Sequence, residues 1–227
     1  MGGPAVTGWA VETSVGSAAA HHGRDVLAGS GRQVWVHRVE RPALVLGSTQ
    51  PEELVDRAAA AAAGVEVARR RSGGGVVLVE PGGTVWVDVV VPPGDPLWDD
   101  DVGRATHWVG EVWARALARC GVADAVVHRG GLVATPWSRQ VCFAGLGPGE
   151  VTVAGRKVVG VAQRRTRHGA RFQVAALLRW DPAALVALLA LADEDRAPAV
   201  ADLATRAAAL PVAENSLVAA VLDALPG

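Results

Sequence analysis

Three consecutive glycines between two strand-like segments constrain the fold of this chain more than any other stretch. Glycines 73–75 follow arginines 69–71 and Ser72, and they precede the apolar residues 76–79. Glycine tolerates positive φ and lets another group approach the main chain closely, while arginine offers fork-shaped donors to a carboxylate or phosphate. Two interpretations stay open from these residues alone: a solvated turn with a basic rim, or a loop that holds an anionic ligand against its backbone.

The composition is that of a globular chain with enough apolar residues for a large core. Of the 227 residues 50% are hydrophobic, and the formal net charge is −1. This charge gives no reason to expect a nucleic acid or an anionic membrane as main partner. Two cysteines are too few for a disulfide framework, the first residues do not resemble a signal peptide, and the longest apolar run is too short to span a bilayer. We expect a cytoplasmic protein with no membrane contact.

Alternating apolar and polar residues predict most of the strands. We expect strands over 33–39, 43–47, 76–79, 84–91 and 172–180, with the first two adjoining and the third and fourth joined as a hairpin. Residues 139–165 are interpreted as a strand, a glycine-rich loop, a second strand, a tight turn at Ala154-Gly155 and a third strand.

Helical spacing of apolar residues predicts the remaining elements. We expect helices over 14–27, 51–64, 101–120 and, broken at Pro198 and Pro211, over 182–225. The prediction is one α+β domain over residues 1–227, a mixed β-sheet flanked by helices, with its core at about 33–180 and helices 182–225 closing the same domain.

Two clusters suggest metal sites only superficially. His21 and His22 are neighbours on an expected helix, where adjacent side chains point about a hundred degrees apart and do not converge on one ion. We expect both on the surface. Aspartates 99–101 precede an amphipathic helix, so a helix cap is favoured over a Mg²⁺ site.

Lys157 and Cys142 are the reactive candidates. Lys157 is the only lysine among many arginines, which indicates a need for a compact ammonium or an amine. Cys142 precedes a glycine-rich loop in a cationic stretch, where positive charge favours a nucleophilic thiolate. The alternative for Cys142, a small buried hydrophobe, stays open, and Cys120 at a helix end is assigned to packing.

Three stretches together resemble the lipoate-protein ligase and octanoyltransferase family. Residues 42–50 resemble its early strand ending in Gly-x-x-Gln, and residues 70–76 (RRSGGGV) are similar to its acyl- and nucleotide-binding loop. Residues 155–163 (GRKVVGVAQ) resemble its Gly-x-Lys-x-x-Gly-Ser-Ala-Gln element. The resemblance covers about residues 33–180 and implies a fold like that of the biotin and lipoate protein ligases and class II aminoacyl-tRNA synthetases.

The family contains two chemistries. In its ATP-dependent ligases the acyl group is adenylated and then attacked by a lysine of a carrier domain, whereas another branch takes octanoyl from acyl carrier protein onto a cysteine. Cys142-Phe143 followed by Glu150 resembles the cysteine branch, and the Asn-Asp pair of the ligases is missing. The resemblance therefore slightly favours transfer through a Cys142 thioester. This route needs no cofactor, whereas the ligase route needs ATP and Mg²⁺.

The resemblance also assigns residues and partners. Lys157 and Cys142 are expected to be catalytic, and the substrate-binding residues are expected to be Arg70, Arg71, Ser72, Gly73, Gly74, Gly75, Gly160 and Ala162. Arg70 or Arg71 would bind phosphate if an adenylate forms. The expected partner is a lipoyl carrier domain of the glycine cleavage H protein or dehydrogenase E2 type, with acyl carrier protein as a second.

The sequence departs from the family at three places. Val79 and Glu80 replace His-Asp after the glycine loop, Val161 replaces the serine of Gly-Ser, and Gln173 replaces the histidine of a later His-Gly-Ser. These changes remove polar groups that handle protons or the acyl carbonyl. They motivate a further alternative, a non-catalytic relative that binds a lipoyl-like ligand or another protein.

Overall fold

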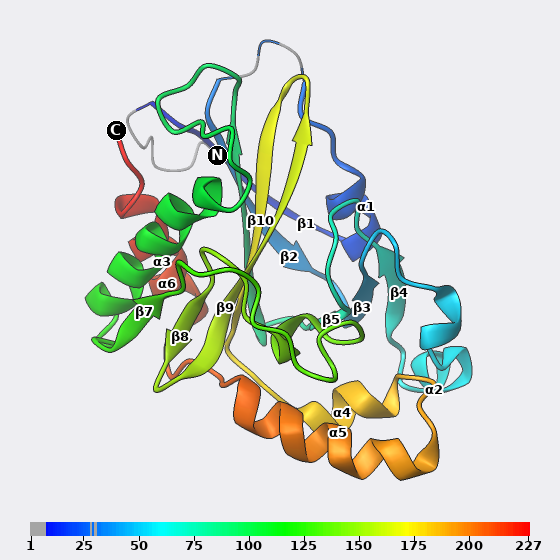
Figure 1. The fold of residues 1–227 in the computed structure, drawn as a ribbon. Coiled ribbons are helices and arrows are strands. Elements are labelled where there is room, and N and C mark those ends of the chain that lie inside the picture. Colours follow the sequence, from blue (N-terminus) through cyan, green and yellow to red (C-terminus); the bar gives the residue numbers. More distant parts are fainter. Residues whose placement is uncertain (1–7, 28, 30) are drawn as a thin grey trace.

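The computed structural model describes residues 8–27, 29 and 31–227, and within them two β-sheets are surrounded by helices (Figure 1). The larger sheet has seven strands in the order β1-β2-β6-β10-β9-β8-β7, and the smaller has three in the order β4-β3-β5. The strands are β1 Ala10–Gly16, β2 Gln33–Val39, β3 Ala43–Leu46, β4 Glu66–Arg69, β5 Val77–Val79, β6 Thr84–Val91, β7 Ala125–Val127, β8 Val151–Val153, β9 Arg156–Thr166 and β10 Gly169–Leu177. The α-helices are α1 Ala18–Gly23, α2 Arg57–Ala62, α3 His107–Arg119, α4 Pro182–Ala187, α5 Asp193–Arg206 and α6 Glu214–Asp223.

Both sheets are mixed. In the larger sheet β1 pairs with β2 in parallel, and the other neighbouring strands are antiparallel. In the smaller sheet β3 pairs with β4 in parallel and with β5 antiparallel. The predicted fold class, a mixed sheet flanked by helices, is confirmed.

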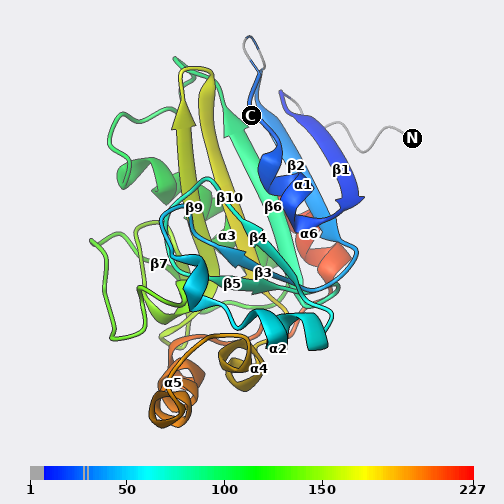
Figure 2. The same cartoon turned by 90° about the vertical axis from the view of Figure 1, so that its right-hand side faces the viewer.

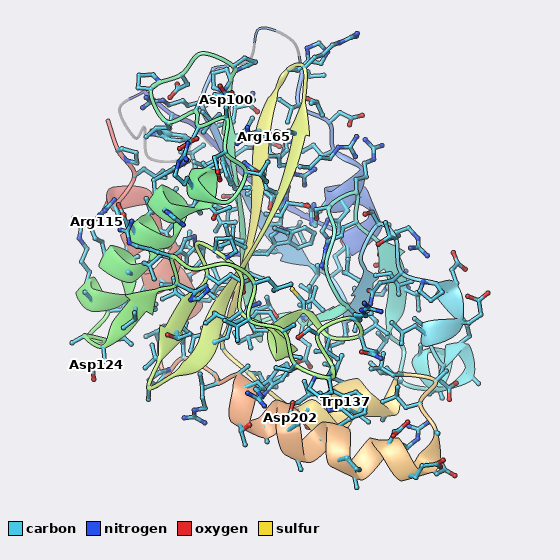
Figure 3. All side chains as sticks on the ribbon, in the orientation of Figure 1. Asp100, Arg115, Asp124, Trp137, Arg165 and Asp202 are labelled. Carbon is cyan, nitrogen blue, oxygen red and sulfur yellow. The ribbon has the colours of Figure 1, made fainter. Side chains whose placement is uncertain are left out.

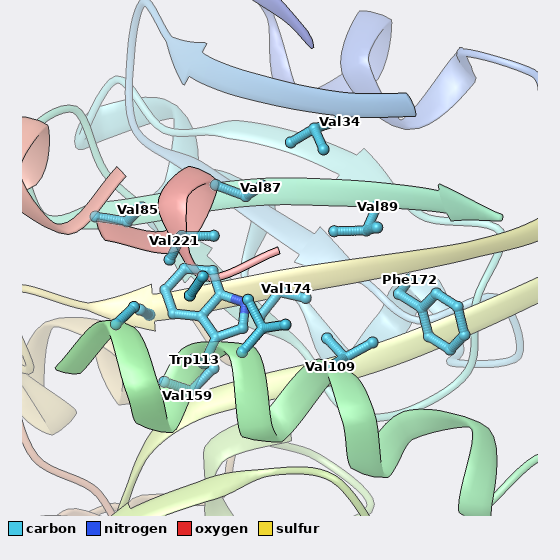
Figure 4. Close-up of a cluster of buried hydrophobic side chains, with 14 of the residues drawn as sticks. Val34, Val85, Val87, Val89, Val109, Trp113, Val159, Phe172, Val174 and Val221 are labelled. Atoms are coloured by element: carbon cyan, nitrogen blue, oxygen red, sulfur yellow. The ribbon is translucent and has the colours of Figure 1, made fainter. Parts of the chain in front are cut away.

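Helices α3 and α6 cover one face of the larger sheet (Figure 4). Trp113 of α3 is fully buried there against valines that alternate along β6, such as Val87 and Val89. Side chains of this size each contribute about 1.5–3 kcal/mol when fully buried. This face therefore holds the main hydrophobic core.

The opposite face of the larger sheet looks toward the smaller sheet (Figure 2). Trp86 of β6 and Leu177 of β10 pack there against Val45 of β3 and Val79 of β5. Because both faces of the larger sheet are covered, every residue of β6 is buried. The high valine content of this strand, which only Thr84, Trp86 and Asp88 interrupt, is consistent with that position.

Helices α4 and α5 lie along the smaller sheet, at the bottom of Figure 1. Leu185 of α4 and Leu203 of α5 pack against Leu44 and Leu46 of β3. Trp137, labelled in Figure 3, joins this cluster from the long loop between β7 and β8. The loop is thereby anchored a few residues before Cys142.

Two predictions of strand pairing are wrong. Residues 76–79 and 84–91 do contain strands, but β5 belongs to the smaller sheet and β6 to the larger, so they form no hairpin. β2 and β3 are divided between the two sheets in the same way. The turns after β2 and β5 therefore carry the chain from one sheet to the other, which the alternation of side chains does not reveal.

The helix predictions are wrong in extent. Residues expected to open a helix at 14 belong to the edge strand β1, and α1 begins only at Ala18. The helix expected over 51–64 is divided at Asp56, whose carboxylate accepts a hydrogen bond from Ala59 N at 2.9 Å and caps α2. Pro198 lies within α5, where it removes a backbone donor without ending the helix. No helix among the described residues is long and apolar enough to cross a membrane.

Candidate active site

The glycine loop packs against two other stretches of backbone. A Cβ on Gly47 would lie 1.9 Å from the carbonyl oxygen of Gly74, and one on Gly75 would lie 2.5 Å from the carbonyl carbon of Val141. Val76 N donates to Gln140 O at 2.7 Å, and Cys142 N donates to Val76 O at 2.9 Å. The glycines are thus required for close approach of main chain, and their packing fixes the turn that carries Cys142.

The arginines beside the loop make contacts of their own. Arg70 is buried, and its guanidinium donates to Gly73 O at 2.9 Å and to Gly75 O at 2.8 Å. Arg69 donates to Gly47 O at 2.9 Å, and Arg71 forms an exposed ion pair with Asp25. Arg70 therefore braces the loop, and phosphate binding by Arg70 or Arg71 stays a prediction.

A narrow apolar cavity lies between the two sheets. Its floor is a face of the larger sheet that carries the small residues Gly160, Ala162 and Ala175, with Gly160 beside Ala175 and Ala162 beside Gln173. A Cβ on Gly160 would lie 3.2 Å from the ring of Phe143, so a side chain at this position would crowd the ring and narrow the cavity. The cavity is lined by His22, Arg70, Val77, Val79, Trp86, Cys142, Phe143, Gly160, Val161, Ala162, Gln173, Val174 and Ala175.

A wider cleft of about 450 Å³ adjoins the narrow cavity. Its walls include glycines 73–75, Glu150 and Lys157. Cys142, Val161 and Ala162 line both spaces, so the narrow cavity opens into the cleft beside the cysteine. Cys142 was expected in a strand, but it begins a single-turn helix, Cys142–Ala144, and its thiol is a free, half-buried one.

The ammonium of Lys157 lies directly under the Cys142 turn. Its Nζ donates to Cys142 O at 2.9 Å and to Gly145 O at 3.1 Å, and it pairs with Glu150 Oε2 at 2.7 Å. The Lys157 side chain is 3% exposed, so its charge depends on these partners. The structure thus brings Lys157 and Cys142 together.

Glu150 is a site residue that the candidate set omitted. Besides the ion pair, its carboxylate accepts from Gly147 N at 2.7 Å and from Val161 N at 3.2 Å. It therefore ties the glycine-rich loop before β8 to the β9 strand. The available signal was its place in the Cys-Phe…Glu spacing, as the single acid of an apolar, glycine-rich stretch.

Gln163, the last residue of the 155–163 motif, is a second residue absent from the expected site. It lines the wider cleft, and within the described part of the chain neither its Oε1 nor its Nε2 has a hydrogen-bond partner. Because buried amides normally form hydrogen bonds, this side chain is a candidate contact for a polar part of a substrate.

A buried polar cluster lies deeper on the same sheet face. Arg171 Nε donates to Asp88 Oδ2 at 2.7 Å, and His37 Nε2 lies 3.1 Å from the same oxygen. Burial by itself raises the pKa of the Asp88 carboxyl, but Arg171 and His37 outweigh burial and lower the pKa to about 2. Asp88 is therefore a charged structural group between β2 and β10.

The expectation that His21 and His22 lie on the surface is wrong. Both are buried, because α1 packs against the larger sheet and the two rings contact Trp86 of β6. Burial lowers the pKa of the His22 imidazole to about 3. His22 Nδ1 lies 2.9 Å from Gln173 Nε2, and Ser72 Oγ donates to Gln173 Oε1 at 2.7 Å.

The expectation that aspartates 99–101 cap the following helix is wrong, because α3 begins at His107 after Thr106 and has no side-chain cap. The carboxylates instead stabilise the turn before it. Asp101 Oδ1 accepts from Arg104 N at 2.8 Å, and Asp99 pairs with the Arg104 side chain. Across the described ranges, no group of three His, Cys, Asp or Glu residues is placed to hold a metal ion.

The two sheets, the helices around them and the cavity between them have the architecture of a lipoate-protein ligase. Residues 9–221 match the profile of the lipoyl protein ligase A/B catalytic domain. The chain belongs to this family. No curated protein matches it.

Solved structures show the same fold at low sequence identity. A putative lipoate protein ligase of Thermoplasma acidophilum with bound lipoic acid has a TM-score of 0.71 and 19% identity, over 94% of this chain and 81% of that one. A bi-partite lipoate protein ligase of that organism, studied with its E2 lipoyl domain, has a TM-score of 0.70 and 18% identity, over 94% and 82%. A lipoate-protein ligase A bound with ATP has a TM-score of 0.64 and 21% identity, over 91% and 75%.

Proposed function

We propose that this protein attaches an octanoyl or lipoyl group to a lysine of a lipoyl carrier domain, through a thioester on Cys142. The observation that carries the proposal is the position of Cys142, where the narrow apolar cavity meets the wider cleft. An acyl chain in the cavity would present its carbonyl carbon at the sulfur. The donor and the acceptor would approach through the cleft.

The transfer has two steps. The Cys142 thiolate attacks the carbonyl carbon of the acyl donor thioester, a new carbon–sulfur bond forms, and the donor thiolate leaves and takes up a proton. The lysine amine of the carrier domain then attacks the enzyme thioester, an amide forms with loss of a proton, and the Cys142 thiolate leaves.

Lys157 supplies positive charge to both steps. Its Nζ lies 2.9 Å from the Cys142 carbonyl oxygen, in a site largely closed to water. A fixed ammonium there stabilises the negative charge that passes between the sulfur and the acyl oxygen. Glu150 holds the ammonium in place, and Gln163 is offered to the polar part of the donor.

The second candidate is an ATP-dependent ligase that works through an acyl adenylate. The wider cleft beside glycines 73–75 favours it, as does the fold shared with a ligase that binds ATP. In that reaction the carboxylate of the acid attacks the α-phosphate of ATP, pyrophosphate leaves, and the carrier lysine displaces AMP. Mg²⁺ would enter with the phosphates, and Arg71 would have to leave Asp25 to reach them. Cys142 would then have a packing role and no part in the chemistry.

The intact mass of an apo lipoyl domain separates these functions. The domain is incubated with the protein and either octanoyl-acyl carrier protein alone or lipoate with Mg-ATP. We expect a mass gain with the thioester, loss of that gain in C142S, and retention in the matched control C120S. A gain only with ATP, retained in C142S, would make the protein a ligase. No gain in either reaction would favour the non-catalytic binding protein.

A further inference from the structure

The inner end of the acyl cavity contains a histidine that the proposed reaction does not use. The mouth of the cavity lies on β9, at Val161 and Ala162, and the floor continues across β10 to Trp86 of β6. Neighbouring strands are about 4.8 Å apart, so Trp86 lies roughly 10 Å from the mouth. An extended eight-carbon chain covers about that distance. The His22 ring lies tilted against Trp86 with 4.4 Å between ring centroids, so it would meet the far end of a chain bound in this cavity.

The hydrogen bonds around Gln173 fix which nitrogen of His22 carries the proton. Ser72 Oγ donates to Gln173 Oε1, so the amide nitrogen of Gln173 is the donor to His22 Nδ1. A neutral imidazole that accepts at Nδ1 carries its proton on Nε2. In the described ranges, no residue forms a hydrogen bond with Nε2, and the ring lines the cavity.

We propose that His22 is a specificity-determining residue, whose Nε2–H selects acyl groups with a hydrogen-bond acceptor at the end remote from the carbonyl. The inference rests on the proposed function, because it names the acyl group that the same cavity prefers. A hydrocarbon end leaves this buried donor unpaired, and an oxygen there satisfies it. An oxidised chain end supplies an oxygen acceptor, and a dithiolane ring supplies sulfur, which is a weaker acceptor.

The His22 imidazole remains neutral despite the negative charge of Asp88, which suits this role. Burial holds its pKa at about 3 against the raising effect of Asp88, and Arg171 and Arg70 act in the same direction as burial. A charged imidazole would instead have to be balanced by an anion inside the cavity. His22 therefore offers a dipole and not a charge to the ligand.

A competition within one reaction tests the inference. Equal amounts of octanoyl and ω-hydroxyoctanoyl donors are supplied, as acyl carrier protein thioesters or as free acids with Mg-ATP, depending on which form supports transfer. The intact mass of the acylated lipoyl domain reports both products, because they differ by one oxygen. A hydrogen bond in such a site changes affinity by about threefold to tenfold. We therefore expect the ratio of hydroxylated to unmodified octanoyl product to be about three to ten. A lipoyl donor in place of the hydroxylated one distinguishes sulfur from oxygen acceptors.

Variants assign the preference to the imidazole. H22F keeps a ring against Trp86 but has no nitrogen, and we expect the product ratio to fall to about one. H22Q restores a hydrogen-bonding group and should recover part of the preference, while H168F, at a half-buried position on the β9–β10 turn outside the cavity, should keep the wild-type ratio. If H22F does not fold, H22Q compared with H22L decides the point.

The outcomes separate the inference from the proposed function. Acylation with equal product ratios in wild type and H22F would overturn the role of His22 and leave the proposed function standing. If no domain is acylated, the proposed function fails. Calorimetry of the two free acids then decides the inference, since equal affinities would overturn it and tighter binding of ω-hydroxyoctanoate, lost in H22F, would support it.

Discussion

The buried imidazole of His22 makes the stability of this protein depend on pH, and the structure sets the sign. Burial lowers the pKa of His22 from 6.5 to about 3. The unfolded chain therefore takes up a proton on this ring below about pH 6.5, whereas the folded protein leaves it neutral until about pH 3. A proton bound only by the unfolded chain favours unfolding, so stability is retained above pH 6.5 and falls as the pH drops below it.

The size of the loss follows from the same shift. About pH 5 lies roughly one and a half pH units below the unfolded pKa, and each unit is worth about 1.4 kcal/mol, so His22 lowers the free energy of unfolding by about 2 kcal/mol between about pH 7 and about pH 5. His21 adds to the loss, because burial lowers its pKa as well.

Urea denaturation at a series of pH values measures this dependence. Below about pH 6.5 the free energy of unfolding should fall less steeply with decreasing pH in H22Q than in the wild type. The difference should approach the contribution of one proton, about 1.4 kcal/mol per pH unit. This holds even if H22Q is less stable at neutral pH. H168Q, on the turn between β9 and β10, serves as the matched control and should keep the wild-type slope. An H22Q slope equal to that of the wild type would refute the account of a neutral, buried His22.

Three further predictions concern the glycine loop and the site. G75A should lower the melting temperature and the transfer rate, because its Cβ would lie 2.5 Å from the facing main chain, whereas G73A, with nothing within 4 Å, should leave the melting temperature near the wild-type value. E150Q should lower the free energy of unfolding by about 3–5 kcal/mol by leaving the buried charge of Lys157 unpaired. Urea denaturation in which E150Q/K157M, which keeps an acceptor for Gly147 N and Val161 N, is less stable than E150Q would contradict this. G160V should narrow the cavity and slow octanoyl transfer more than transfer of a short acyl group; equal slowing in the mass assay would show that the chain lies elsewhere.

Local patterns in the sequence found most elements but not their partners. Alternation predicted strands where β2, β3, β5 and β6 lie, yet it gave no sign that the last two belong to different sheets. β1 was missed because its residues, AVETSVG, are polar or small apart from two valines and are mostly exposed at a sheet edge. Pairing depends on contacts between distant segments, which periodicity does not encode.

The candidate site was found from unusual residues and missed where it depends on packing. The glycine run, the single lysine and Cys142 stand out in the sequence, and the structure brings them together. The burial of His22 depends on α1 lying over Trp86, about sixty residues away in the chain. No local pattern distinguishes such a histidine from a surface one.

The central claim is that the acyl group passes through Cys142, and the intact mass of the protein itself tests it most directly. After a short incubation with octanoyl-acyl carrier protein and no lipoyl domain, we expect the protein to gain one octanoyl group, with the adduct on the peptide that contains Cys142 and absent from C142S. Addition of apo lipoyl domain should remove the adduct and acylate the domain. An unmodified enzyme that still acylates the domain, or an adduct that persists in C142S, would contradict the claim.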